Sequence, residues 1–137
     1  MMGTKSKIAS YRDLLVWQKG MDLVVKSYAL SKQLPPSETY GLAAQIQRSA
    51  VSVPANVAEG HGRRHLGDYL HHLSVANGSL KELETHLLIA QRLCLLRPDD
   101  VDGTLALAEE IGRMLRGLAQ ELRKKSATTR VPLRPTT

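Results

Sequence analysis

Hydrophobic residues recur at steps of three and four along most of the chain, which is the period of an α-helix with one buried face. The most regular stretch begins near His65, ends near Cys94 and keeps this spacing over about four heptads, as in a coiled-coil seam. Its seam positions are Leu66, Tyr69, Leu73, Ala76, Leu80, Leu83, Leu87, Ala90 and Cys94. This stretch predicts a long helix packed along its length.

Two further stretches predict the first and last helices. Asp13 is placed to cap a helix that carries Trp17 on its apolar face and ends before Pro35 and Pro36. The last helix starts at Pro98, with aspartates in its first turns and arginines and lysines towards its end, where they complement the helix dipole.

The stretch between Ser37 and Gly60 predicts a helix that is almost uncharged, because only Glu38, Arg48 and Glu59 carry charge there. Ser37 is the expected cap, and Pro54 predicts a bend within the helix. A surface helix of a bundle normally presents a charged face to water. We therefore expect this helix to be covered on more than one side and to form a contact between subunits.

A line of polar residues runs beside the apolar face of this helix, and a second polar stripe flanks the seam of the long helix that follows. We expect the two lines to meet, because buried polar groups need partners and such a match sets the register of two helices. The residues assigned to this interface and polar seam are Gln45, Ser49, Ser52, Asn56, Glu59, Asn77 and Glu84.

Four helices joined by short turns predict an all-α fold, an antiparallel up-down-up-down four-helix bundle. Hydrophobic residues make up 42% of the chain but aromatic residues 4%, with no Phe, which favours helices with an aliphatic core. The expected division is a flexible basic arm over residues 1–12, a bundle over 13–125 and a disordered tail over 126–137.

Several classes of protein are disfavoured by composition. The single Cys94 leaves no internal disulfide, and the chain shows neither a membrane-spanning run nor a signal peptide, so we expect a cytoplasmic protein with no membrane contact. The formal net charge of +6 permits an acidic partner such as RNA or DNA.

Three groups of residues suggest a chemical role, and each also has a plainer explanation. His65, Asp68 and His72, with His61 nearby, share a helical face and form a conceivable metal site, but a solvated surface is the more common reason for such a group. Cys94 lies on the apolar seam with no evident base, which argues against covalent catalysis. The remaining polar pair, Asn56 and Glu59, fits a structural contact better than a catalytic one. We therefore predict no catalytic residues, no metal and no cofactor.

Nucleic-acid binding is the remaining active function that the residues suggest. One basic cluster, Arg63, Arg64 and His65, follows the second predicted helix, and another, Arg123, Lys124 and Lys125, lies near the end of the fourth. A cluster of three basic residues is weak evidence for nucleic-acid binding by a monomer. The same cluster repeated around an oligomer would form a continuous positive surface.

Three successive segments resemble a known family: DLLVWQKGMDLV, YGLAAQIQRSAVSVPANVAEGHGRR and DYLHHLSVANGSLKELETHLLIA. They are similar to the signatures of the four-helix bundle family named for proteins encoded in 23S rRNA intervening sequences. The resemblance covers Tyr11 to about Leu122. Tyr11 and Gly20 depart from the family's usual Phe and Ala.

The resemblance implies a bacterial helical bundle that assembles into a homopentameric ring, with no established enzymatic activity. The accessory protein of diversity-generating retroelements is similar in architecture and binds nucleic acid through a basic surface. By that analogy Arg48, Arg63 and Arg64 are candidate contacts. Arg123, Lys124 and Lys125 are further candidates because of their charge. We therefore expect a non-catalytic homo-oligomer that interacts with RNA or DNA; the alternative is a structural or protein-interaction ring that binds no nucleic acid.

Overall fold

The structure is a computed structural model that describes residues 8–129 of the chain. Four α-helices and two short 3-10 helices make up this part. In chain order they are η1 (Tyr11–Asp13), α1 (Leu15–Ser31), η2 (Pro36–Glu38), α2 (Leu42–His61), α3 (Leu66–Arg92) and α4 (Pro98–Thr129).

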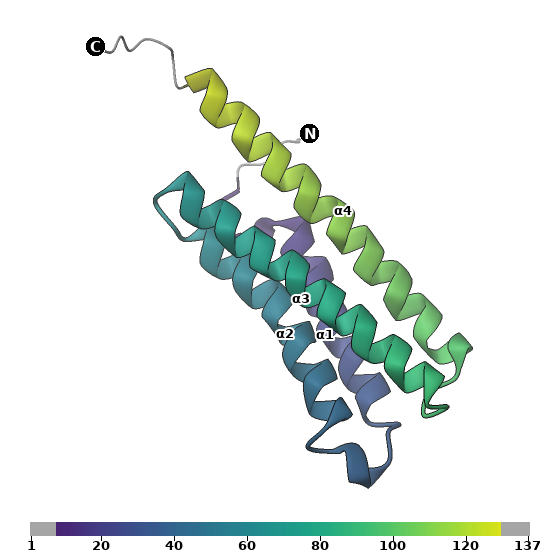
Figure 1. The fold of residues 1–137 in the computed structure, drawn as a ribbon. Coiled ribbons are helices and arrows are strands. Elements are labelled where there is room, and N and C mark those ends of the chain that lie inside the picture. Colours follow the sequence, from purple (N-terminus) through teal and green to yellow (C-terminus); the bar gives the residue numbers. More distant parts are fainter. Residues whose placement is uncertain (1–7, 130–137) are drawn as a thin grey trace.

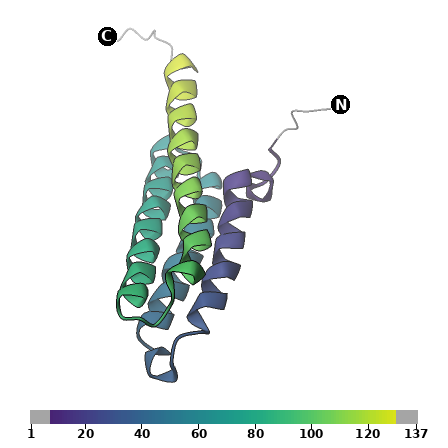
Figure 2. The ribbon, with the colours of Figure 1, turned by 90° about the vertical axis from the view of Figure 1, so that its right-hand side faces the viewer.

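The four helices form an antiparallel up-down-up-down bundle, as predicted (Figure 1). Each helix packs against the next one along the chain, and α4 closes the bundle by packing against α1. Figure 2, turned by 90°, shows the end of α4 projecting past the other helices. Among residues 8–129, no helix combines the length and the apolarity that crossing a membrane would need.

The core consists of aliphatic side chains from all four helices. On α3 the predicted seam is buried from Leu73 to Ala90, with Leu66 and Tyr69 partly buried at its start. The assignment of Cys94 to this seam is wrong, because the helix ends at Arg92 and Cys94 is exposed with a φ of 61°. The N–H groups of Leu95 and Leu96 bond back to the carbonyl oxygen of Ala90 at 2.8 and 3.3 Å, and closing the helix end in this way requires a left-handed residue at Cys94.

Asp13 and Ser37 were predicted to cap α-helices, but each lies within a 3-10 helix instead. The carboxylate of Asp13 accepts hydrogen bonds from the N–H groups of Ala9 and Ser10 at 2.9 and 3.0 Å and so closes η1, while α1 begins two residues later. Ser37 lies inside η2, and α2 begins at Leu42, whose N–H donates to Glu38 at 3.1 Å. The expected cap at Ser37 is therefore wrong, and the carboxylate of Glu38 bonds to the first residue of α2 instead.

Two glycines allow neighbouring helices to approach closely. A Cβ added at Gly20 would lie 3.2 Å from the Cβ of Pro54, so α1 and α2 pack directly against each other there. A Cβ at Gly60 would lie 2.8 Å from the Cβ of His72, where α2 meets α3. The helix α2 continues through Pro54 from Leu42 to His61, and its proline ring is buried against α1.

The predicted division of the chain differs from the helix bounds at the C-terminal end. Helix α4 continues to Thr129, so residues 126–129, assigned to a tail, belong to the helix. The remainder of that tail, residues 130–137, and the first seven residues of the predicted arm lie outside the described residues.

Candidate nucleic-acid interface

The up-down topology brings two basic clusters that are far apart in the sequence to one end of the bundle. Helix α2 ends, α3 begins and α4 ends at this pole (Figure 1). Arg123 of α4 lines a groove together with Leu70, which lies in the second turn of α3. We call the basic residues at this pole the basic end: Arg63, Arg64, Arg123, Lys124 and Lys125.

The cations of the basic end differ in how far they are already engaged. The guanidinium of Arg63 donates to the carboxylate of Glu59 at 2.6 Å, so part of its charge is compensated within the chain. Arg64 and Arg123 are exposed and form no ion pair within residues 8–129. Arg64 and Arg123 are therefore better placed than Arg63 to meet a phosphate group.

Arg48 lies apart from the basic end. It precedes the end of α2 by more than three turns, which corresponds to about 20 Å along the helix. Its side chain is exposed beside a shallow groove that also contains Tyr28 of α1 and Val51 of α2. Within one chain, Arg48 thus cannot share a single phosphate contact with Arg64.

The polar line of α2 does meet α3, but through partners that the sequence analysis did not assign. Ser79 donates its hydroxyl to that of Ser52 at 2.7 Å, and Asn56 donates its amide to the same Ser52 oxygen at 3.0 Å. The amide oxygen of Asn56 lies 3.0 Å from Nδ1 of His72. Because the amide nitrogen of Asn56 already donates to Ser52, this oxygen accepts, and Nδ1 of His72 is the donor.

This network connects the helix interface to the basic end. Nε2 of His72 lies 3.9 Å from the Glu59 carboxylate, which in turn binds Arg63. The side chain of Asn56 therefore joins α2 to α3, and the carboxylate of Glu59 binds Arg63 close to His72.

The other residues assigned to the polar seam lie elsewhere. Ser49 is buried and donates to the Gln45 carbonyl of its own helix at 2.8 Å, and the Gln45 side chain is exposed. Asn77 lies across from Gly112 of α4, and Glu84, seven residues further, lies on the same face of α3. The expected match of α2 with Asn77 and Glu84 is therefore wrong, because this face of α3 is turned towards α4.

The residues of α3 that contact the polar line of α2 could have been identified from their spacing in the sequence. His72 and Ser79 are seven residues apart, as are Ser52 and Glu59, so the two pairs can align on antiparallel helices. His72 was considered instead with His65 and Asp68, as a conceivable metal site for which a solvated surface was the favoured explanation. Within the part of the chain that the structure describes, no group of three or more His, Cys, Asp or Glu side chains is arranged to hold a metal ion.

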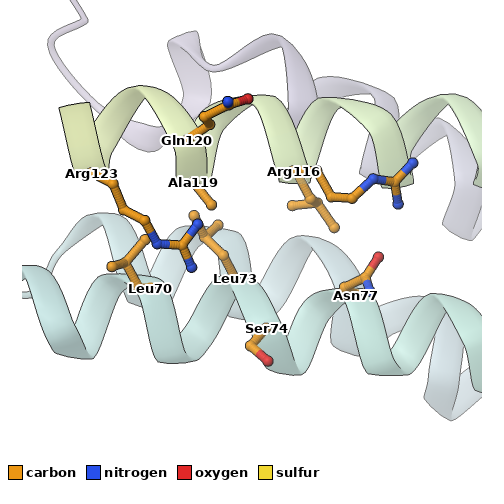
Figure 3. A pocket seen from close by; sticks show the side chains of 9 residues that line it. Leu70, Leu73, Ser74, Asn77, Arg116, Ala119, Gln120 and Arg123 are labelled. Carbon is orange, nitrogen blue, oxygen red and sulfur yellow. The ribbon is translucent and has the colours of Figure 1, made fainter. Parts of the chain in front are cut away.

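A groove between α3 and α4, open at the surface near the basic end, has no counterpart in the sequence analysis (Figure 3). It encloses about 570 Å³, and its rim carries Arg116 and Arg123 of α4. Arg116 is one of the arginines of the last helix, which were expected only to complement the helix dipole. The remaining lining residues are Leu70, Leu73, Ser74, Asn77, Leu115, Ala119 and Gln120.

Comparison with known proteins identifies the family of the chain and a solved structure with a similar fold. Residues 12–117 match the sequence model of the family described as 23S rRNA-intervening sequence protein. A crystal structure of a protein with unknown function from the S23 ribosomal protein family of Bacteroides thetaiotaomicron superposes with a TM-score of 0.72. That structure is 22% identical and covers 77% of this chain and 99% of its own. A comparison with curated proteins finds no match.

Proposed function

Because this chain belongs to the 23S rRNA-intervening sequence protein family, we propose that it is a non-catalytic, homo-oligomeric bundle protein that binds RNA or DNA through its basic end. The observation that carries the proposal is the convergence of the α2–α3 loop and the end of α4. This convergence places Arg64 and Arg123, which are exposed, at the same pole of the molecule.

Phosphate binding by such a surface depends on the number of cations that act together. One chain offers a small cluster, and each cation that neutralises a phosphate releases a counterion. In a ring, which the family resemblance suggests to be a pentamer, each subunit would repeat the cluster, and linked weak contacts would raise the effective affinity. Oligomerisation therefore belongs to the proposed function.

The outer surface of α2 is the proposed contact between subunits. Val51 has 42% of its surface exposed and Tyr28 of α1 has 37%, and both line the shallow groove that contains Arg48. Ala44, Gln47 and Ser52 complete this surface, so Arg48 is its one charged residue. A surface with little charge and with exposed apolar groups is typical of a covered face.

A structural or protein-interaction ring is the second candidate, and this same α2 surface favours it. The ring would assemble through α2 with no role for the basic end. The two candidates thus share an assembly and differ in whether the basic end binds phosphate.

The test is binding of labelled structured RNA and duplex DNA over a salt series. The double variant Arg64→Ala/Arg123→Ala removes two charges from the basic end, and Lys26→Ala/Arg92→Ala removes two exposed charges from other parts of the bundle. With duplex DNA, the slope of log affinity against log salt should become shallower by about 1.8 in the first variant, at about 0.9 for each lost phosphate contact. The control should keep the slope of the parent protein.

The oligomeric part is tested separately by native mass. Val51→Glu places a carboxylate on the proposed contact without touching the monomer core, and it should lower the native mass. Absence of binding at low salt, or equal loss in both double variants, would overturn phosphate binding at the basic end and leave the ring alternative. An unchanged native mass in Val51→Glu would overturn the α2 contact.

A further inference from the structure

The groove between α3 and α4 combines an apolar floor with a basic rim. Leu73 and Leu115 are almost fully buried at its base, and Leu70 and Ala119 are partly exposed along it. Figure 3 shows Arg123 reaching from α4 across the groove towards Leu70 and Leu73. The floor therefore favours a flat apolar group, while the rim favours a negative charge.

The two rim arginines are spaced along the groove. Arg116 and Arg123 lie seven residues apart on α4, a rise of about 10 Å. With this spacing the two arginines can meet different phosphates of one strand that runs along the groove.

The polar groups between the arginines suit the edges of nucleobases. Ser74 and Gln120 are exposed on opposite walls of the groove, and they offer a hydroxyl and an amide that can each donate or accept. A guanidinium plane can also stack on a base where no aromatic side chain is present. An unpaired base could thus lie on Leu70 and Ala119 beneath Arg123.

A duplex cannot use this floor, because its bases remain stacked inside the helix and only its phosphates reach the arginines. An acidic peptide would also meet the two arginines. The nucleotide is favoured because Arg123 belongs both to the groove and to the basic end, so that a strand held at the basic end continues into the groove.

We propose that the groove between α3 and α4 accepts unpaired bases, so that the protein binds single-stranded nucleic acid in preference to duplex. This inference rests on the proposed function. It adds that recognition depends on bases as well as phosphates, with Leu70 and Ala119 as the floor and Arg116 and Arg123 as the rim.

The experiment uses three labelled probes: a mixed-sequence single strand, its duplex, and the same strand with abasic sites across its middle. Ala119→Met fills the floor without changing charge, and Ala106→Met makes the same change at an exposed site on the same helix. The single strand should bind at least about fivefold more tightly than the abasic strand, which is the lower end of the effect of losing one stacked base. Ala119→Met should remove this difference, and Ala106→Met should retain it.

The outcomes separate this inference from the proposed function. Equal binding of intact and abasic strands, or of single strand and duplex, would overturn the base-binding groove while phosphate binding stands. Retention of the full difference in Ala119→Met would also overturn it. Failure of all three probes to bind at low salt would overturn both proposals, and binding of an acidic peptide in their place would assign the groove to a protein partner.

Discussion

Helix α2 packs tightly against α3 at Gly60, and replacing this glycine by alanine tests whether the polar network depends on that close packing. The added Cβ would lie 2.8 Å from the Cβ of His72, 3.0 Å from Cδ1 of Tyr69 and 3.3 Å from the Tyr69 carbonyl oxygen. The Cβ of His72 is fixed to the backbone of α3, so a rotamer change cannot relieve this contact. The two helices must move apart at the point where His72 reaches Asn56.

Three contributions determine how much Gly60→Ala changes the free energy of unfolding. Overpacking of this kind costs about 1–3 kcal/mol. Weakening the 3.0 Å bond between His72 and Asn56 costs about 1 kcal/mol more. The higher helix propensity of alanine compared with glycine stabilises the variant by about 1 kcal/mol. We therefore expect Gly60→Ala to lower the free energy of unfolding by about 1–3 kcal/mol.

A matched control is available on α3. A Cβ added at Gly78 meets no atom within 4 Å, so Gly78→Ala should gain only the helix propensity and stabilise the protein by about 1 kcal/mol. Urea unfolding followed by far-UV circular dichroism, at one protein concentration, would compare the two variants. The expected effects have opposite signs. If Gly60→Ala were as stable as Gly78→Ala, close packing at Gly60 would not be what positions His72.

Three further predictions concern single residues. Cys94→Gly should raise the free energy of unfolding by about 1 kcal/mol in thermal denaturation under reducing conditions, since its φ of 61° suits glycine; no change would contradict the turn geometry. Burial raises the pKa of Tyr69 above its ordinary value of 10.0, so the unfolded chain ionises first and stability should fall as pH rises above that value. Tyr69→Phe should lose less stability over that alkaline range, and parallel curves for the two proteins would refute this reasoning. Glu59→Gln frees Arg63 and should steepen the salt dependence of duplex DNA binding by about 0.9, whereas an unchanged slope would show that Arg63 makes no phosphate contact.

The spacing of hydrophobic residues along the chain was sufficient to predict the fold and most of the core residues. Leu73, Leu80, Leu83 and Leu87 are buried as their spacing predicted. Helical period reports which face of a helix is covered, and short turns between four such helices leave the antiparallel bundle as the natural arrangement. The sequence also identified the two basic clusters.

The partners across the helices were decided by the tertiary structure. The helical period determines where a side chain points around the axis of its own helix. It does not determine which neighbouring helix that side chain faces, because this contact depends on how the helices are rotated and shifted along their axes relative to each other. Asn77 therefore faces α4. The residues of α3 that contact the polar line of α2 are His72 and Ser79. The ends of helices were likewise set by backbone hydrogen bonds beyond the pattern, as at Cys94.

The sequence by itself determined which residues are apolar, which are basic and which helices they occupy. Only the tertiary structure decided that the loop after α2 and the end of α4 share one pole, that Glu59 engages Arg63, and that Arg116 and Arg123 border a groove. The physical reason is that side-chain identity and helical period are local properties. Proximity between distant segments depends instead on how whole helices pack, and on the glycines at which they come closest.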